Sequence, residues 1–356
     1  AKKAVATVLS GPAGGITASV HACRTTGVQN LITFDMGGTS CDVALIKDGE
    51  PSISNRGKVE GRDVALPMID INTVSAGGGT LAHVDRFGEL VVGPQSAGAM
   101  PGPACYMRGG TQPTITDCNL VLGYLSPGNF LGGKMSLDAQ ASRDAIARAV
   151  ADPLKVSVED AAEGIVRIIN VKMQEAIKAI STMRGHDLRD FMLLAFGGAG
   201  PLHAGRIAQD LGMAGVIVPL YPGVYSAMGL VMSDVKHDYI RSRLTALSNV
   251  TEAQVNEVFA QLEAQARADL AQEHFAPEQT DIEYALDLRY AGQGYEITLS
   301  CKAPLAPGDL KALRAGFDEE HRKMFGHTAP NEPVEIVSYR LRGVGRVPPV
   351  ELPEFK

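Results

Sequence analysis

The first third of the chain alternates short apolar runs with glycine-rich turns, a pattern that predicts strands and loops. An apolar run at 31–34 is followed by Asp35 to Ser40 and then by a second apolar run at 43–46. Because the chain returns at once into a strand, this segment predicts a β-hairpin. Up to about residue 135, helical spacing of apolar residues is confined to a short segment at 15–25.

Helical spacing dominates the middle of the chain. One helix is predicted over 137–150, and a longer one begins at Ser157, where Asp160 forms a variant of the capping box. Apolar residues recur at helical spacing from there to Arg184, and Gly185 supplies the residue that follows the helix. Its isoleucine-rich face predicts that this helix is largely buried.

A continuous apolar run at 191–196 is followed by glycines at 197–201, a helical segment at 202–211 and an apolar segment at 216–218. An apolar run without alternation is typical of a central strand that is covered on both faces. Strand, glycine turn, helix and strand in this order predict a crossover compatible with nucleotide binding.

The last third has the pattern of a separate domain. A charged amphipathic helix is predicted over 251–274, and another over 308–325 that ends at Gly326. Strands are predicted at 282–290, 295–300 and 334–344. At 356 residues the chain exceeds the usual size of one core, so we expect an α/β protein with two domains, 1–245 and 246–356.

Composition narrows the class of protein. Apolar residues make up 45% of the chain and tryptophan is absent, which favours an aliphatic α/β protein. The net charge of −7 and the scattered basic residues exclude an electrostatic footprint for nucleic acid. Five cysteines without a C-x-x-C pair indicate a reducing cytoplasm. Prolines and glycines interrupt the apolar stretch 213–232, so a strand, a loop and a helix are predicted there rather than a membrane span.

The predicted hairpin turn carries the residue types of a phosphate site. Gly37 and Gly38 allow close approach of the backbone to a ligand, and Thr39 and Ser40 can donate hydrogen bonds to it. The alternative is an ordinary hairpin, because paired glycines mark many turns. A phosphate beside carboxylates needs a cation, so Asp35 or Asp42 is expected to orient water or hold the water shell of Mg²⁺.

Two other glycine segments leave alternatives open. The segment Gly197 to Pro201 offers a flat surface for adenine or ribose, or is a packing turn between strand and helix. The segment Ser10 to Gly15 lies against a phosphate channel, or leads into a helix without binding a ligand.

Three further segments carry candidate chemistry. Asp70 to Thr73, followed by Gly77 to Gly79, suits a nucleotide, a substrate or a plain turn, and three successive glycines indicate close approach to some neighbour. Pro94 to Tyr106 is predicted to be a long ordered loop that forms a lid or lines a substrate. Thr114 to Asp117 is predicted to be a strand that ends in the carboxylate of Asp117. This carboxylate either binds a metal or acts as a base, or it is buried and caps the segment 119–123.

The other reactive side chains give weaker signals. No pair among His83, His186 and His203 has the spacing of metal ligands, so structural zinc is not expected. The thiol of Cys105 has no assigned base, which argues against nucleophilic catalysis there.

Several long motifs in this order resemble the hydantoinase A / 5-oxoprolinase family. They are FDMGGTSCDVAL, DINTVSAGGGTLAHVD, VGPQSAGAMPGPACY, TITDCNLVLGYL, FGGAGPLHA and, near the C-terminus, RYAGQGYE and FGH. The resemblance implies a ribonuclease-H-like half domain of the type found in actin, sugar kinases and heat-shock ATPases, followed by a smaller α+β domain. It also implies ATP-dependent hydrolysis of a hydantoin or 5-oxoproline. Ketone carboxylases are close relatives.

One departure from the family pattern is large. Members begin with another glycine-rich hairpin of the type D-x-G-G-T-x-T, which this sequence lacks, and the chain starts without methionine. We therefore expect a C-terminal portion that is poorly active alone and that is completed by an N-terminal half and a hydantoinase B-type subunit. Cys41 stands where threonine is common in the family, which puts one hydroxyl donor in doubt.

The predicted function is ATP-dependent ring opening of a cyclic amide through phosphorylation of the amide oxygen. The cofactors expected are ATP and Mg²⁺, with Mn²⁺ as an alternative metal, in a cytoplasmic homo-oligomer. The alternatives are an ATP-dependent carboxylase subunit acting on a ketone and a nucleotide-responsive assembly subunit without catalysis. The predicted site residues are Asp35 and Asp117 for catalysis and metal, Gly37, Gly38, Thr39 and Ser40 for phosphate, Gly197, Gly198 and Gly200 for adenosine, and Asn72, Gly77, Gly78 and Gly79 for substrate.

Overall fold

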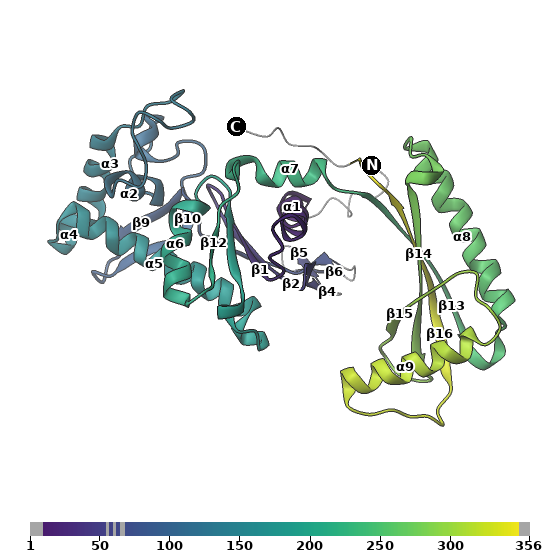
Figure 1. The fold of residues 1–356 in the computed structure, drawn as a ribbon. Helices are drawn as coiled ribbons and strands as arrows, with labels where there is room; N and C mark the ends of the chain where they lie inside the picture. Colours follow the sequence, from purple (N-terminus) through teal and green to yellow (C-terminus); the bar gives the residue numbers. More distant parts are fainter. Residues whose placement is uncertain (1–9, 55–56, 60–61, 65–67, 349–356) are drawn as a thin grey trace. The chain divides into compact units, whose positions relative to one another are not determined.

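The computed structural model describes residues 10–54, 57–59, 62–64 and 68–348 (Figure 1). The chain divides into two compact units, Ala1–Val231 and Met232–Lys356, each built around its own β-sheet. This division falls ahead of the boundary predicted at 245/246. The reason is that β13 (Val235–Ala246), which was not predicted, pairs with the last strand of the second unit.

The main sheet of the first unit is mixed and has the strand order β12-β11-β1-β2-β3, with β8 also paired to β2. The predicted hairpin is confirmed as β1 (Leu31–Met36) and β2 (Cys41–Lys47). On its other side β1 lies parallel to β11 (Met192–Phe196), so these two strands end at the same edge of the sheet. The remaining strands of this sheet are β3 (Glu50–Pro51), β8 (Ile71–Val74) and β12 (Gly215–Ile217).

Helices cover both faces of this sheet. Alternate residues of β1 point to opposite sides. Ile32 and Phe34 pack in one core with α5 (Val158–Ile180) and α6 (Gly200–Leu211). Leu31 packs in a second core with α1 (Ser10–Thr26) and α7 (Tyr225–Val231). The result is a helix–sheet–helix sandwich in which the predicted central strand is buried on both sides.

The helix predicted from Ser157 is α5, and its cap is confirmed. The Ser157 hydroxyl accepts a hydrogen bond from the backbone N–H of Asp160. A single 3₁₀ turn follows the helix and ends at Gly185, whose φ of 82° is the left-handed conformation expected of a glycine after a helix. The stretch 213–232 contains a strand, a 3₁₀ turn and a helix, as predicted, and no described helix is long and apolar enough to cross a membrane.

Two elements differ from the prediction. Thr114 to Asp117 is not a strand; it begins α2 (Ile115–Val121), because Thr114 and Asp117 form a reciprocal capping box. Helix α1 starts at Ser10, earlier than the predicted residue 15, and so includes the glycines of the Ser10 to Gly15 segment. A Cβ on Gly14 would overlap the Ser226 carbonyl oxygen of α7, so this glycine permits close helix packing.

The rest of the first unit is made of short elements. They are β4 (Ile53–Ser54), β5 (Gly57–Val59), β6 (Arg62–Val64), β7 (Met68–Ile69), β9 (Thr80–Val84), β10 (Leu90–Ser96), α3 (Ala139–Ile146), a π-helical turn (Ala147–Ala151) and α4 (Asp152–Leu154).

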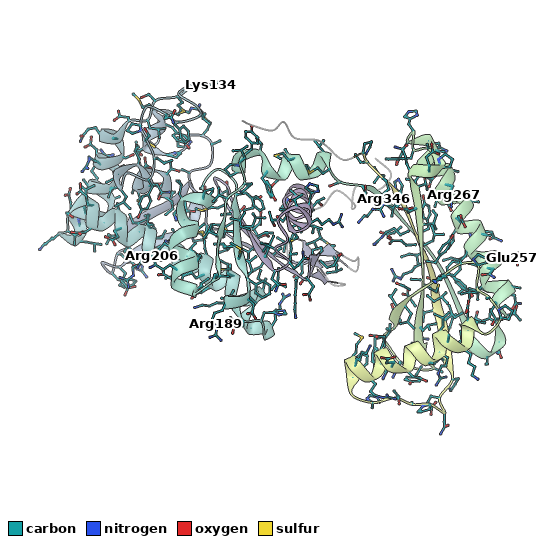
Figure 2. The ribbon with its side chains drawn as sticks, in the orientation of Figure 1. Lys134, Arg189, Arg206, Glu257, Arg267 and Arg346 are labelled. Atoms are coloured by element: carbon teal, nitrogen blue, oxygen red, sulfur yellow. The ribbon has the colours of Figure 1, made fainter. Side chains whose placement is uncertain are left out.

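The second unit is a four-stranded antiparallel sheet with the order β13-β16-β14-β15. Helices α8 and α9 share an apolar core with it, and Glu257 and Arg267 lie on the solvent side of α8 (Figure 2). The predicted helices and strands of this unit are confirmed within a few residues. They are α8 (Glu252–Gln272), β14 (Thr280–Tyr290), β15 (Ile297–Cys301), α9 (Asp309–Phe325) and β16 (Val334–Gly345).

Candidate functional site

The hairpin turn between β1 and β2 presents unpaired backbone donors. The turn is closed by a hydrogen bond from Gly37 N to Ser40 O (3.1 Å). Gly38 and Thr39 are exposed. Among the described residues, none accepts a hydrogen bond from the backbone N–H groups of Gly38, Thr39 or Ser40. Adjacent backbone N–H groups of a turn that lack a partner in the protein can form a site for an anion.

Two carboxylates lie at the base of this turn. Asp35 and Asp42 are directly opposite each other in the hairpin register. The Ser226 hydroxyl donates to Asp35 Oδ2 (3.0 Å), and the Thr73 hydroxyl donates to Asp42 Oδ1 (2.5 Å). In the described part of the chain, no arginine or lysine forms a salt bridge with either of them.

Burial is the main cause that raises the pKa of Asp35 and the pKa of Asp42. The negative charge of Asp42 raises the pKa of Asp35 further, while the Ser226 hydrogen bond opposes this. Partly buried carboxylates that repel each other and lack a positive partner are favourable ligands for a hard cation.

The glycine turn after β11 touches the hairpin directly. Ala199 N donates to Met36 O (2.9 Å). Gly197 has a φ of 79°, and a Cβ there would lie 2.5 Å from Asp35 Oδ1, so two independent constraints require glycine. Gly198 is exposed, and the space around its missing side chain is open. Helix α6 begins at Gly200. The structure therefore brings the two glycine segments singled out in the sequence to one place.

The glycine run at 77–79 packs against the turn. Gly78 N donates to Gly37 O (3.0 Å), and Gly79 N donates to Gly38 O (2.7 Å). A Cβ on Gly77 would overlap the backbone nitrogen of Thr39. The expected close approach is thus to the hairpin itself, and these glycines fix the backbone of the turn.

The environment of Asp117 contradicts the prediction that this residue serves catalysis and metal binding. Its side chain is fully buried. Its two oxygens accept five hydrogen bonds, from Ala104 N (3.1 Å), Cys105 N (2.9 Å), Thr114 N (2.9 Å), Thr114 Oγ1 (2.8 Å) and Ser142 Oγ (2.7 Å). Five donors occupy the lone pairs that a metal ion would need. The geometry favours the capping alternative.

Asn72, predicted to contact substrate, is also not part of the turn. Its amide nitrogen donates to Ala176 O of α5 (3.1 Å), which ties β8 to the helix layer. The doubt over Cys41 is removed as well. Its side chain is buried in the core beneath the sheet, so a hydroxyl at this position would not reach a ligand at the turn.

The remaining reactive side chains are structural. Burial and the neighbouring Asp117 raise the pKa of the Cys105 thiol, which keeps it protonated and poorly nucleophilic. His203 is buried between Asn119 (Nε2 to Nδ2, 3.1 Å) and Asn170 (Nδ1 to Oδ1, 2.8 Å), and burial lowers its pKa to about 4. The described residues contain no cluster of three or more potential metal ligands among His, Cys, Asp and Glu.

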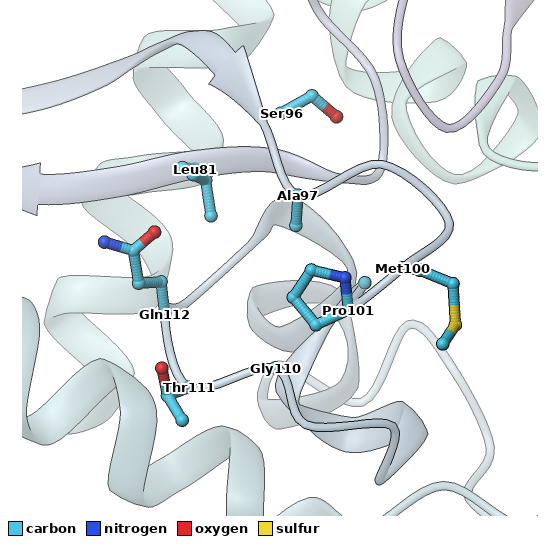
Figure 3. A pocket seen from close by; sticks show the side chains of 9 residues that line it. Leu81, Ser96, Ala97, Met100, Pro101, Gly110, Thr111 and Gln112 are labelled. Atoms are coloured by element: carbon cyan, nitrogen blue, oxygen red, sulfur yellow. The ribbon is translucent and has the colours of Figure 1, made fainter.

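The segment Pro94 to Tyr106, predicted to be one long loop, begins in β10 and ends in a 3₁₀ turn, and part of it lines a pocket. The pocket has a volume of about 380 Å³ (Figure 3). It is lined by Leu81 of β9 and by residues of two segments, 96–102 and 110–112. It borders the glycine run, because Ala97 N donates to Gly79 O (2.8 Å).

Three polar side chains of the site were not identified from the sequence. Ser226 and Thr73 donate to the paired carboxylates, and the Thr116 hydroxyl donates to Gly78 O (2.9 Å). Thr73 stands within a motif that was recognised, but nothing in the local pattern links Ser226, on α7, to a residue almost two hundred positions earlier in the sequence.

Two models of one protein family match the chain. The model described as hydantoinase/oxoprolinase matches residues 1–239, and the C-terminal domain model of the same family matches residues 245–354. The chain belongs to the hydantoinase/oxoprolinase family. The predicted family is confirmed, and the predicted fold class is confirmed as an α/β unit followed by a smaller α+β unit.

Similar members of the hydantoinase/oxoprolinase family differ in named activity. The caprolactamase α subunit of Pseudomonas jessenii is 39% identical over 99% of this chain and 51% of its own length. 5-Oxoprolinase 1 of Arabidopsis thaliana is 35% identical over 95% of this chain and 28% of its own length. The nucleotide-free structure of ATP-dependent acetone carboxylase superposes with a TM-score of 0.84 at 30% identity, covering 98% of this chain and 51% of the other. The chain spans about half the length of the first of these relatives.

Proposed function

We propose that the protein takes part in the ATP-dependent ring opening of a cyclic amide, and that the hairpin turn 37–40 binds the terminal phosphate of ATP. The observation that carries the proposal is the set of three unpaired backbone N–H groups at this turn, next to two carboxylates without a cation and in contact with the Gly197 turn. Membership of a family that includes a caprolactamase and a 5-oxoprolinase supports it.

Each part of the turn has a role in this proposal. The N–H groups and the hydroxyls of Thr39 and Ser40 donate to phosphate oxygens, and the open surface at Gly198 accepts the adenosine. Asp35 and Asp42 fit a divalent cation, because each carboxylate has a single described hydroxyl donor and a raised pKa. Mg²⁺, or Mn²⁺ as the alternative, supplies positive charge at this position when it is bound. Asp117 has no part in the metal site.

The proposed reaction has three steps. The amide oxygen attacks the γ-phosphorus, so that a new O–P bond forms as the bond to the bridging oxygen of ADP breaks. Water then adds to the activated amide carbon and the C–N bond of the ring breaks, so that the nitrogen leaves as an amine and an acyl phosphate remains. A second water attacks the acyl carbon, which releases phosphate and leaves the carboxylate of the ring-opened product. The protein contributes position and fixed dipoles, because the rigid turn N–H groups meet the charge that develops on phosphate.

We propose that two further parts complete the enzyme. A complementary half would supply the other phosphate hairpin, which is consistent with relatives about twice as long as this chain. The second part is a hydantoinase B-type subunit, in line with relatives that are named as subunits.

Phosphate release measured in the intact protein with its partner subunit tests the proposal. ATP hydrolysis should be stimulated by caprolactam, hydantoin or 5-oxoproline, and the ring-opened product should appear in equal amount to phosphate. Absence of stimulation by any cyclic amide would contradict it.

A carboxylase is the second candidate, favoured by the similarity to acetone carboxylase. Stimulation by acetone with bicarbonate, and by no cyclic amide, would establish it. Tight ATP binding in calorimetry, without hydrolysis in the reconstituted complex, would instead favour a nucleotide-responsive assembly subunit.

A further inference from the structure

We propose that the pocket formed by residues 96–102 and 110–112 binds the cyclic amide, that it selects an uncharged ring, and that Gln112 is the residue that recognises the amide group. The inference rests on the proposed function, because it assigns the substrate position next to the phosphate turn. It follows from the location, the charge and the polar groups of the pocket.

The pocket lies near the phosphate turn, because one residue, Gly79, is hydrogen-bonded to both. Gly79 donates through its N–H to Gly38 O (2.7 Å) and accepts through its carbonyl from Ala97 N (2.8 Å). A single glycine therefore separates the turn from the pocket wall. A Cβ on Gly79 would lie 2.9 Å from both Gly38 O and the Ser96 hydroxyl oxygen, which shows how closely the two sides approach. Phosphoryl transfer needs the accepting oxygen beside the terminal phosphate.

The charge of the pocket selects a neutral ligand. None of the nine lining residues in the described part of the chain is charged. Arg148 contacts this segment, but its guanidinium donates to the Thr111 carbonyl oxygen (3.3 Å) and it is not a lining residue. A carboxylate such as that of 5-oxoproline would lose water without gaining a positive partner, whereas a neutral lactam or hydantoin would not.

The polar groups suit an amide. Gln112 is exposed, and no described residue forms a hydrogen bond with its side-chain amide. In Figure 3 this side chain and Leu81 lie on one side of the pocket, and Met100 and Pro101 lie on the other. A cyclic amide is locked in the cis form, so its N–H and C=O lie side by side. A carboxamide offers the matching acceptor and donor, which a ketone would use only in part.

Hydrogen bonds hold the backbone that follows Gln112. The next residue, Pro113, accepts a hydrogen bond from Ala82 N (3.1 Å), and Thr114 bridges to Leu81. Asp117 then joins both walls, because it accepts from Thr114 on one segment and from Ala104 and Cys105 on the other. Asp117 is thus a positioning residue for the pocket and not a catalytic one. A pre-organised wall lowers the entropic cost of binding a small ring.

The experiment measures binding and turnover separately in the intact protein. Caprolactam and 5-oxoproline are titrated by ligand-observed NMR in the presence of a non-hydrolysable ATP analogue, and ATP turnover is followed in parallel. The variants are Gln112→Leu and the nearly isosteric Gln112→Glu, with Gln140→Leu as the matched control, because Gln140 is exposed on α3 and bonds only Asp144 among described residues.

Caprolactam should bind more tightly than 5-oxoproline. Both Gln112 variants should raise the Kd for caprolactam about 10-fold and leave the Kd for the ATP analogue unchanged. Gln140→Leu should change neither Kd. Caprolactam binding that is equal in all variants, absent in the unsubstituted protein, or no tighter than that of 5-oxoproline would overturn the inference. If binding follows the inference but no cyclic amide stimulates ATP hydrolysis, the pocket assignment stands and the proposed function fails.

Discussion

Two sets of acidic side chains, one in each unit, have opposite environments. In the second unit, Asp287 is almost fully buried, and Arg340 donates to it (2.6 Å) together with the Thr298 hydroxyl (2.6 Å). In the first unit, Asp35 and Asp42 are half-buried, face each other and have no positive partner among the described residues. The charge of Asp287 is neutralised within the protein, as expected of a structural residue. The charges of Asp35 and Asp42 are not neutralised by any described residue, as expected of a site that binds a cation.

Replacing Asp35 should give the largest effect and separate stability from function. Asp35→Asn should lower ATP-dependent turnover by about 100-fold or more, because a cation ligand is lost. The same change should raise Tm at pH 7, because it removes a partly buried charge whose pKa is raised in the folded state. Turnover assays and thermal denaturation check both effects.

The Tm advantage of Asp35→Asn also has a predicted pH dependence. A carboxyl with a raised folded-state pKa favours the folded state when protonated, and this contribution is lost as pH rises through that pKa. The Tm difference between variant and parent should therefore shrink as pH is lowered toward the range where Asp35 is protonated. If the Tm of Asp35→Asn instead rises relative to the Tm of the parent as pH falls, Asp35 is already neutralised by a partner.

Asp287→Asn should have the opposite effect on stability. It leaves Arg340 without its carboxylate, so the free energy of unfolding should fall by about 2 kcal/mol. ATP binding to the first unit should be unchanged. Denaturant unfolding together with an ATP titration checks this, and a stabilised Asp287→Asn would remove the contrast between the two units.

Gly77→Ala should displace the phosphate turn, because its Cβ would overlap the Thr39 nitrogen. We expect kcat/KM for ATP to fall about 10-fold. Gly205→Ala is the matched control. It lies within α6, has open space around its missing side chain, and should be neutral or stabilising by about 0.5 kcal/mol. Equal activity of the two variants would indicate that the glycine run does not position the turn.

Gly198→Ala should have the smallest effect. Its Cβ would meet no atom within 4 Å, and its φ is not in the left-handed region, so the fold should tolerate it. A methyl group on the proposed adenosine surface should raise KM for ATP about threefold while leaving Tm unchanged. An unchanged KM would place the adenosine elsewhere.

The sequence predicted elements well where one periodicity dominates. Helix α5, with its Ser157 cap, and the helices and strands of the second unit other than β13 were located within a few residues. It failed at Thr114 to Asp117, where β-branched residues suggested a strand and a capping box formed a helix. There local propensity was overridden by hydrogen bonds that Asp117 makes to residues distant in the sequence.

Within the site, glycine positions were the most predictable part. Gly197 and the run at 77–79 converge because close backbone approach excludes larger residues, a constraint that is visible in the sequence itself, whereas Gly37 has open space around its missing side chain. The roles of polar side chains were less predictable. Whether Asp35 or Asp117 is free to bind a ligand depends on how many donors surround each carboxylate, and those donors come from segments that only the fold brings together.

The central claim is that the turn between β1 and β2 binds phosphate through its backbone. The most direct measurement is the amide NMR spectrum of the isotopically labelled protein, titrated with ATP and Mg²⁺ and, separately, with adenosine. The account predicts that ATP shifts the N–H resonances of Gly38, Thr39 and Ser40 and that adenosine, which lacks phosphate, leaves them in place. Resonances that stay unchanged while ATP demonstrably binds would contradict it.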